Sequence, residues 1–191
     1  MEDPFVRFQG LFERAQREER GDATVMALAT ADAAGRASVR MVLLKGADQR
    51  GFVFFTNYQS RKARELDARP SAALCLHWPA LAVQVRIEGG VEKLTAEESD
   101  GYFATRPRYS QVGAWASIQS APLAGRAWLL ARFLRETLRF AGRRVPRPPQ
   151  WGGYRVAPDR VEFWYNQVYR LHDRILYERS GDGWRTRRLY P

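Results

Sequence analysis

The first cluster of residues that could bind an anion consists of Ser60, Arg61 and Lys62. It follows an apolar run, and the pattern predicts that a helix begins there. Free backbone N–H groups, a hydroxyl and two cations at a helix start can form a phosphate site. A capped helix start with solvated charges would use the same residues, so both interpretations stay open on this segment alone.

Two further cations, Arg40 and Lys45, bound the run RMVLLK. Their odd spacing would place them on opposite faces of a strand, so they cannot both line one solvent face. The chain has 31 basic residues, and only Lys45, Lys62 and Lys93 among them are lysines. The lysines in the first two clusters are therefore candidates for sites that require a compact ammonium group.

Tyr102, Arg106 and Ser110 form a second candidate anion site. The first two are four residues apart on one face of a predicted helix, and Ser110 follows in a predicted loop. Their guanidinium and hydroxyl groups could grip a phosphate, although a helix end with an exposed arginine is the alternative. The run 113–120, which ends in Gln119 and Ser120, has small side chains that would let a ligand approach the backbone, or it is a tight loop.

The third candidate is the sequence RLHDR, which contains Arg170, His172 and Arg174. On a strand these three side chains would share one face. Bringing such groups together is costly unless an acidic ligand meets them. A structural histidine is the alternative. His77 and Cys75 lie in an apolar run, where we expect His77 to be structural and Cys75 to pack as a small apolar residue.

The elements that must position these side chains are mostly short strands. The pattern predicts strands at 24–30, 39–45, 51–56, 72–78, 83–94, 160–165 and 174–178. It predicts helices within 3–20, at 60–69, from the capping box at 95–98 to before Pro107, and at 125–140. We expect a hairpin turn at 32–35 and an extended connector at 145–150. This order favours an antiparallel barrel with peripheral helices, mainly β and α+β in content.

Composition limits the function. The chain has 191 residues, a formal net charge of +10, one cysteine and two histidines. The charge favours anionic partners, while the cysteine and histidine counts make a disulfide or a metal site implausible. No apolar run is long enough to span a membrane and no secretory leader is evident, so we expect a cytoplasmic protein. Hydrolase triads, GxGxxG, Walker and HExxH motifs are absent.

Taken together, the motifs resemble the pyridoxamine (pyridoxine) 5'-phosphate oxidase family from about residue 24 to the end of the chain. The match rests on their joint order and spacing. The motifs are RMVLLK at 40–45, GFVFFTN at 51–57, SRK at 60–62, QVRIEG at 84–89, YFATRP at 102–107, QVGAWAS at 111–117, QS at 119–120, PRPPQWGGYRV at 146–156, EFW at 162–164, RLHDR at 170–174 and a final LYP.

The resemblance implies one FMN-binding split-barrel domain over residues 1–191, with an N-terminal helix in 1–20 and a C-terminal segment, 146–191, that completes the site. It implies a homodimer that binds FMN at the subunit interface. The residues implied for FMN are Arg40, Met41, Val42, Leu43, Leu44, Lys45, Phe55, Thr56, Arg61, Lys62, Gln84, Gln119, Ser120, Trp164 and Arg174. Those implied for the substrate are Lys45, Tyr102, Arg106, Ser110, Arg170, Leu171 and His172, with Arg170 and His172 as catalytic residues.

The chemistry implied by the resemblance is oxidation of the C4' carbon of pyridoxamine 5'-phosphate or pyridoxine 5'-phosphate to pyridoxal 5'-phosphate. A hydride passes to the flavin, and dioxygen reoxidises the flavin with release of hydrogen peroxide. The family needs no metal. Its members often begin with a longer arm that closes over the substrate, and we expect this chain to lack that arm.

Two alternatives remain. One is a sister FMN oxidase of the same fold with another substrate, as in phenazine biosynthesis. The other is a basic, non-enzymatic protein that binds flavin or nucleic acid, supported by the net charge and by a row of arginines at 132, 135 and 139. No nucleic-acid motif accompanies that charge, so we expect neither a nucleic-acid partner nor a membrane partner.

Overall fold

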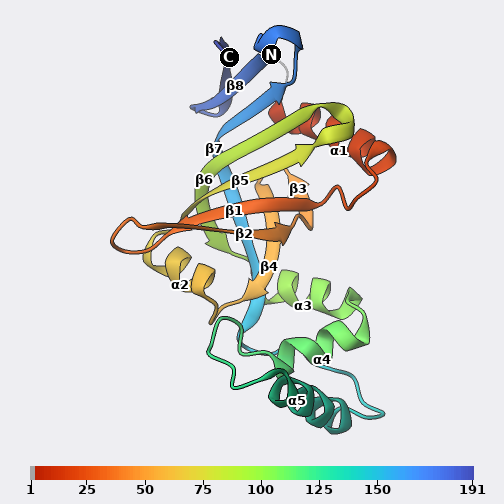
Figure 1. Cartoon of the computed structure of the whole chain (residues 1–191). Helices are drawn as coiled ribbons and strands as arrows, with labels where there is room; N and C mark the ends of the chain where they lie inside the picture. The colour runs from red at the N-terminus through yellow and green to blue at the C-terminus, as the bar shows by residue number, and fades with distance from the viewer. Residues whose placement is uncertain (1–2) are drawn as a thin grey trace.

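A single curled antiparallel sheet dominates the computed structural model, which describes residues 3–191 (Figure 1). The strand order is β2-β1-β5-β6-β7-β4-β3, and β8 and β9 continue from β7. The strands are β1 (Val25–Ala31), β2 (Ala37–Leu43), β3 (Gly46–Asp48), β4 (Gly51–Asn57), β5 (Ser71–Trp78), β6 (Val83–Lys93), β7 (Trp151–Tyr165), β8 (Asp173–Ser180) and β9 (Gly183–Leu189). The sheet forms an open barrel of the kind that the resemblance implied.

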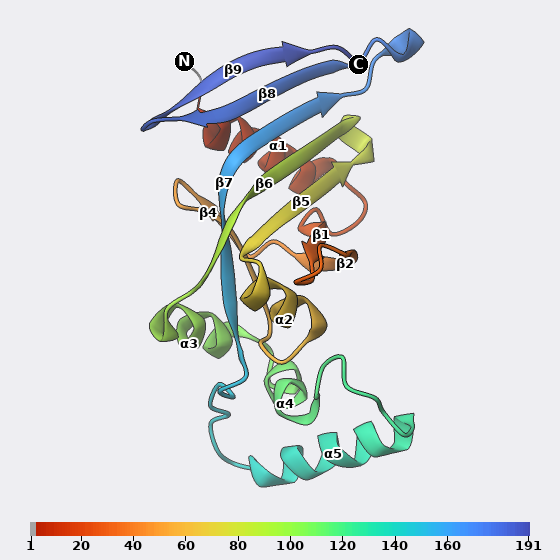
Figure 2. The ribbon, with the colours of Figure 1, turned by 90° about the vertical axis from the view of Figure 1, so that its left-hand side faces the viewer.

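Helices lie outside this sheet and between its strands. They are α1 (Pro4–Glu18), α2 (Arg61–Ala68), α3 (Ala96–Thr105), α4 (Arg108–Ala116) and α5 (Arg126–Arg139), with 3-10 turns η1 (Pro79–Leu81) and η2 (Val168–Arg170). The views in Figures 1 and 2 place α3, α4 and α5 at one end of the molecule and β8 and β9 at the other. The described residues therefore form a sheet with a helical end and a sheet-only end.

Strand β7 connects these two ends. It has 15 residues and pairs along its length with β4, β6 and β8. Its first residue, Trp151, lies beside the helices, and its last residue, Tyr165, lies beside β8. Figure 2 shows the strand running lengthwise through the molecule. At about 3.3 Å per residue, the ends of this strand are separated by roughly 40 Å.

The main core lies between α1 and the sheet. Phe8 of α1 meets Phe52 of β4 edge-on, with ring centroids 4.9 Å apart, and also packs against Trp78. All three side chains are almost fully buried. A second, smaller core joins α3, α4 and the end of α5 to the start of β7 through Phe103, Val112, Phe140, Val145 and Trp151. The helical end therefore has its own apolar contacts.

Most predicted elements are confirmed. Alternation correctly identified β6, in which Val83, Val85 and Ile87 are buried. The capping box of α3 is present, because Thr95 accepts a hydrogen bond from the backbone of Glu98 and the Glu98 side chain accepts one in return. The turn at 32–35 joins β1 and β2. Residues 1 and 2 of the predicted N-terminal segment lie outside the described residues.

Four local predictions were wrong. Ser110 lies inside α4, because a new helix begins directly after Pro107. Strand β2 ends at Leu43, so the alternation argument does not extend to Lys45. The strand predicted at 160–165 begins at Trp151, where paired glycines hid the strand pattern. Strand β9, whose sequence GWRTRRL is too polar to resemble a core strand, was not predicted.

The irregular point in the β6–β7 ladder generates a test of the fold. A Cβ at Gly89 would collide with the backbone carbonyl of Ala157, where the register shifts between Glu88 and Gly89. A Cβ at the next glycine, Gly90, would have its nearest neighbour 4.0 Å away.

Because the backbone must move to admit the new methyl group, we expect Gly89→Ala to destabilise the protein by about 1–3 kcal/mol. That corresponds to a melting temperature lowered by roughly 2–4 °C per kcal/mol for a chain of this size. Gly90→Ala is the matched control and should leave the melting temperature unchanged or slightly higher. Equal melting temperatures for the two variants, measured by circular dichroism, would contradict the close approach at Gly89.

Candidate functional site

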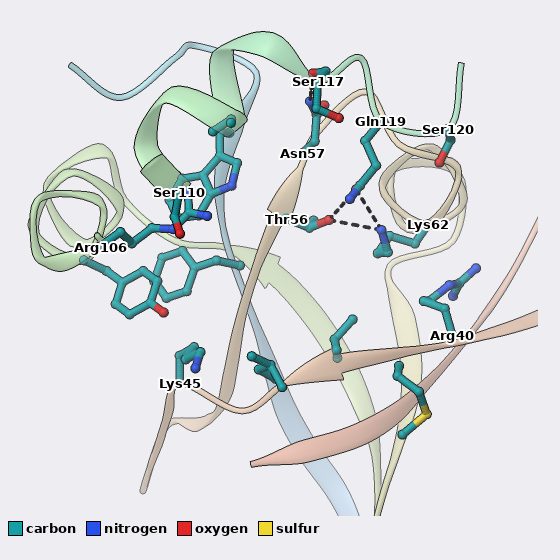
Figure 3. A pocket seen from close by; sticks show the side chains of 18 of the residues that line it. Arg40, Lys45, Thr56, Asn57, Lys62, Arg106, Ser110, Ser117, Gln119 and Ser120 are labelled. Atoms are coloured by element: carbon teal, nitrogen blue, oxygen red, sulfur yellow. Dashed lines mark hydrogen bonds between the residues drawn. The ribbon is translucent and has the colours of Figure 1, made fainter. Parts of the chain in front are cut away.

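A cavity of about 1070 Å³ opens between the first strands and the helical end. Its walls come from β2, β4, the start of α2, the α3–α4 corner and the loop after α4 (Figure 3). Its lining residues are Ser38, Val39, Arg40, Met41, Val42, Leu43, Lys45, Phe55, Thr56, Asn57, Arg61, Lys62, Tyr102, Thr105, Arg106, Pro107, Ser110, Gly113, Ala114, Ser117, Gln119, Ser120 and Trp151. Segments far apart in the sequence thus meet at one cavity.

One side of the cavity is organised around Lys62. Its ammonium group is buried and donates hydrogen bonds to Thr56 Oγ1 at 3.1 Å, Gln119 Oε1 at 3.0 Å and Ser60 Oγ at 3.3 Å (Figure 3). All three acceptors are neutral. Burial, reinforced by the nearby Arg40 guanidinium, lowers the pKa of Lys62 to about 8. An anion placed here would stabilise the charged form of this lysine.

The start of α2 faces the same side. Ser60 is the N-cap residue, as predicted, but its hydroxyl accepts from Lys62 and caps no backbone N–H. The N–H of Arg61 donates to Ser120 Oγ at 3.1 Å, which fixes the loop after α4 against the helix start. Ser120 has a φ of 70°, in the left-handed region. The loop residues Gln119 and Ser120 are therefore held beside the predicted phosphate cluster.

A buried carboxylate, Glu65, orients the cations of this side. It accepts hydrogen bonds from Thr30, from Ser38 at 2.7 Å, from Arg40 at 3.1 Å and from Arg61 at 2.8 Å. Burial alone would raise the pKa of Glu65, but these four hydrogen bonds outweigh it and lower that pKa to about 2. The carboxylate is therefore ionised at neutral pH and holds both guanidiniums.

The opposite side of the cavity is aromatic and carries Arg106. The guanidinium lies 4.6 Å from the ring centroid of Trp151, and its buried NH1 has no hydrogen-bond partner. Burial lowers the pKa of Arg106, which shows that its charge is poorly solvated. Phe55 stacks on Tyr102 with centroids 4.0 Å apart and on Trp151 at 5.3 Å. Figure 3 shows Arg106 next to Ser110, with Lys45 on the same side of the view and Lys62 and Arg40 on the other.

The residues on the two sides of the cavity can be compared with the site residues predicted from the sequence. Fourteen of the predicted site residues line the cavity, and the structure brings Arg40 and Lys45 to it together. The expected opposite orientation of these two cations is wrong, because Lys45 lies beyond the end of β2. Arg106 lies just after α3, as its C-terminal cap residue, rather than within the helix. Leu44 does not line the cavity; its side chain is buried in the main core.

Six other predicted residues lie at the far end of β7 and do not line this cavity. We call them the distal group: Gln84, Trp164, Arg170, Leu171, His172 and Arg174. Gln84 pairs with Trp164, which pairs with Arg174. The rings of Trp164 and His172 have centroids 4.5 Å apart. The distal group is a compact cluster at the end of β7 opposite Trp151.

The local structure of the distal group differs from the prediction. Arg170, His172 and Arg174 do not share one strand face, because β8 begins only at Asp173. Arg170 ends the 3-10 turn with a φ of 62°. His172 accepts a hydrogen bond at Nδ1 from the backbone of Gln167 at 3.2 Å. A tight turn therefore replaces the predicted extended segment.

Arg174 is held by a second buried carboxylate. Its Nε donates to Glu162 Oε1 at 2.7 Å, and its NH1 donates to the carbonyl of Tyr190 at 3.0 Å. The other oxygen of Glu162 accepts from Arg86 at 3.3 Å. Glu162 thus binds two guanidiniums at the far end of the sheet, as Glu65 does beside the cavity.

Sequence reasoning missed several residues of the site. Glu65 lies four residues after Arg61 on α2, and Ser38 lies two residues before Arg40 on the same face of β2. Both spacings were readable from the sequence. Asn57 lines the cavity and donates to the Ser117 carbonyl, with no such signal. Residues 3–191 contain neither a side-chain cluster fit for a metal ion nor a helix fit to span a membrane.

Glu65→Gln tests the role of the buried carboxylate. The folded-state pKa lies below the ordinary glutamate value of about 4.3, so the ionised group stabilises the fold above that pH, and this stabilisation is lost as the pH falls toward 2. We expect the variant to be less stable near neutral pH by on the order of 2–3 kcal/mol. The difference from the native protein should shrink as the pH is lowered from about 5 to about 3.

Urea unfolding followed by circular dichroism at several pH values measures this difference. Glu13→Gln is the control, because Glu13 is exposed on α1 and bonded only to Gln9 among the described contacts. A difference that stayed constant over this pH range would contradict the low pKa of Glu65.

Comparison with known proteins relates the sequence of this chain to one family. Residues 12–140 match the family described as pyridoxamine 5'-phosphate oxidase, and residues 151–191 match the pyridoxine 5'-phosphate oxidase C-terminal dimerisation region. The chain is 58% identical over 189 residues to a pyridoxine/pyridoxamine 5'-phosphate oxidase of Anaeromyxobacter dehalogenans, covering 99% of this chain and 96% of the relative. A Myxococcus xanthus relative of the same name is 56% identical over 99% of this chain and 92% of its own length.

Solved structures have the same fold. PhzG from Burkholderia lata 383, in complex with tetrahydrophenazine-1-carboxylic acid, superposes with a TM-score of 0.94 at 34% identity, covering 99% of this chain and 93% of that one. A pyridoxamine 5'-phosphate oxidase-related, FMN binding protein from Nostoc punctiforme has a TM-score of 0.76 at 16% identity, covering 96% and 97%. The second likeness concerns the fold alone. The sequence matches and the cavity together show that this chain belongs to the pyridoxamine 5'-phosphate oxidase family.

Proposed function

We propose that this chain is an FMN-dependent oxidase that converts pyridoxamine 5'-phosphate and pyridoxine 5'-phosphate to pyridoxal 5'-phosphate. Dioxygen is the electron acceptor, and hydrogen peroxide is released. One observation carries the proposal: a single cavity holds two separate cations, the buried Lys62 and the half-buried Arg106, each without a carboxylate among its described hydrogen-bond partners. Two phosphorylated planar ligands would satisfy both.

The Lys62 side fits the phosphate of FMN. A desolvated ammonium group, the guanidiniums of Arg40 and Arg61 and the N-terminus of α2 all face one part of the cavity. Such a set of donors matches a dianionic phosphate. The strand residues Met41, Val42 and Leu43 offer an apolar wall and backbone groups for the ring system. The residues present therefore fit the cofactor.

The Arg106 side fits the phosphate of the substrate. Its NH1 is buried and unpaired, so a ligand oxygen would supply the missing hydrogen bond. Tyr102, Ser110 and Lys45 line the same side and can complete the grip. A vitamer without the phosphate would leave the Arg106 guanidinium without this hydrogen bond, which favours phosphorylated substrates.

The distal group completes the site from a second copy of the chain. It lies around the end of β7 opposite Trp151, and none of its residues lines the cavity of its own chain. It falls largely within residues 151–191, which match the dimerisation region of the family. In a symmetric dimer each distal group can lie at the partner's cavity. Gln84, Trp164 and Arg174 would then contact FMN, and Arg170, Leu171 and His172 the substrate.

Bound FMN supplies the acceptor for the hydride that leaves C4' and the route for electrons to dioxygen. The protein positions the two ligands by their phosphates and holds the reacting carbon against the flavin. Arg170 and Leu171 are exposed on the turn before β8, where they can lie over the substrate ring. Because His172 Nδ1 accepts a hydrogen bond, its Nε2 carries the proton of the neutral ring and can donate to the substrate.

A sister oxidase acting on a phenazine precursor is the second candidate, since PhzG has a closely similar structure. The identity of this chain to PhzG is 34%, against 58% to the Anaeromyxobacter pyridoxine/pyridoxamine 5'-phosphate oxidase. The paired phosphate sites also favour the vitamin B6 substrates.

A half-buried single cysteine, Cys75, agrees with a reducing, cytoplasmic setting.

The substrate assay tests this proposal. The purified protein should be yellow with bound FMN and should release peroxide with pyridoxine 5'-phosphate. It should release little with unphosphorylated pyridoxine, because that substrate leaves Arg106 unpaired. A reduced phenazine carboxylic acid is the comparison substrate. Faster turnover of that acid would favour the sister oxidase, and a colourless protein that cannot be reconstituted with FMN would refute both oxidases.

Mixing two inactive variants tests the shared site. Arg106→Ala damages the cavity and Arg170→Ala damages the distal group, so each homodimer should lose most of its activity. When both chains are co-expressed, half of the dimers are mixed and each mixed dimer has one intact site, so about one quarter of the native activity should return. Co-expression of Arg106→Ala with Lys62→Gln is the control and should restore none. Absence of recovery with the first pair would show that one chain builds the whole site.

A further inference from the structure

The outer face of α5 takes no part in the proposed reaction, and it is unusually apolar for an exposed surface. Ala127, Leu130, Ala131, Leu134 and Leu138 follow helical spacing and share one side of the helix. The three leucines are 55%, 59% and 66% exposed, and both alanines are exposed as well. We call these five residues the α5 stripe.

The inner side of α5 already has its packing partners. Phe140 belongs to the smaller core, Phe133 packs against that core, and Arg132 donates to the Ala116 carbonyl at 2.8 Å. The cavity lining contains no residue of α5. The helix also precedes residues 151–191, the stretch that matches the dimerisation region. The stripe is therefore explained neither by the core nor by the cavity, and it lies outside the stretch that matches the dimerisation region.

Positive charge surrounds the stripe. Residues 117–150 contain seven arginines and one acidic residue, Glu136. That carboxylate is buried and is bound by Arg135 at 3.2 Å and Arg139 at 3.1 Å. Only Arg147 of this segment pairs with an exposed carboxylate among the described contacts, that of Asp100 at 2.6 Å, and much of the +10 net charge of the chain is concentrated here.

Shape and charge together indicate the occupant. Figures 1 and 2 place α5 at the end of the molecule farthest from β8 and β9, as a helix lying along the outside. A convex helix with an apolar stripe, arginines beside it and a 66% exposed tryptophan, Trp128, has the features of a helix that lies in a membrane interface. We propose that the α5 stripe docks the enzyme on an anionic lipid surface.

Other occupants fit these features less well. Two copies packed stripe to stripe would bring their arginine rows together without acidic residues to pair with them. A nucleic acid would contact the arginines but would leave the leucines exposed. The proposal departs from the expectation of no membrane partner, which rested on the lack of a membrane-spanning segment and does not bear on surface binding.

Vesicle sedimentation of the full-length, FMN-loaded protein tests the proposal. We expect the native protein to pellet with vesicles that contain phosphatidylglycerol and to remain in solution with vesicles of phosphatidylcholine alone. Replacing the three leucines together (Leu130→Gln, Leu134→Gln, Leu138→Gln) should weaken binding by more than about tenfold, because it removes the apolar area that inserts. Val6→Gln, at a 63% exposed position on α1, is the control and should bind like the native protein.

A charge series separates local from overall electrostatics. Neutralising arginines beside α5 (Arg126→Gln, Arg143→Gln, Arg144→Gln) should weaken binding strongly. Neutralising three exposed arginines elsewhere (Arg17→Gln, Arg20→Gln, Arg64→Gln) changes the net charge equally and should have a much smaller effect.

Three results would overturn the proposal. These are a native protein that does not bind the anionic vesicles, a leucine variant that binds them as the native protein does, and equal losses for the two arginine sets. Light scattering tests whether the stripe instead binds a second copy of the chain. That would follow if the native protein formed a larger assembly than the leucine variant and did not bind vesicles. Unchanged FMN content and peroxide release in all variants report that the fold and the cavity are intact.

Discussion

The length of β7 constrains everything else in this protein. One continuous strand begins beside the helices and ends beside β8, and it pairs with β4, β6 and β8 on the way. Its second and third residues are glycines because Tyr58 lies against Gly152, and Phe55 and Leu94 lie against Gly153, where no Cβ would fit. The strand therefore packs tightly against the cavity at one end and carries the distal group at the other. A site that needs both groups needs two chains.

Buried carboxylates and unpaired cations have opposite roles in this arrangement. Glu65 and Glu162 each bind two guanidiniums, so the arginines around them are held in fixed positions. Lys62 and Arg106 have no such partner, and burial shifts the pKa of both downward. Desolvated charge of this kind destabilises the ligand-free protein, and binding an anion removes that cost. The contrast distinguishes residues that build the cavity from residues that we propose bind ligands within it.

The sequence predicted what depends on neighbours along the chain. Alternation in β6, the Thr95–Glu98 capping box and the turn at 32–35 are local signals, and each is present. The helix containing Ser110 and the turn containing Arg170 were not predicted, because both depend on packing that a short window does not contain. The joint order of motifs identified the family when no single cluster could. It named residues of both the cavity and the distal group, although in one chain these lie far apart.

The arginines explain why net charge was a weak guide until the structure placed them. Some are structural, such as Arg155, which is 6% exposed and bridges Glu92 and Glu98, and Arg147, which bonds Asp100. Others face the cavity, where the charge is left for ligands. A third set lies in residues 117–150 around α5, a segment with a single buried acidic residue. Arginines of the same chain thus have different partners, and only their burial and contacts, which the sequence does not specify, separate them.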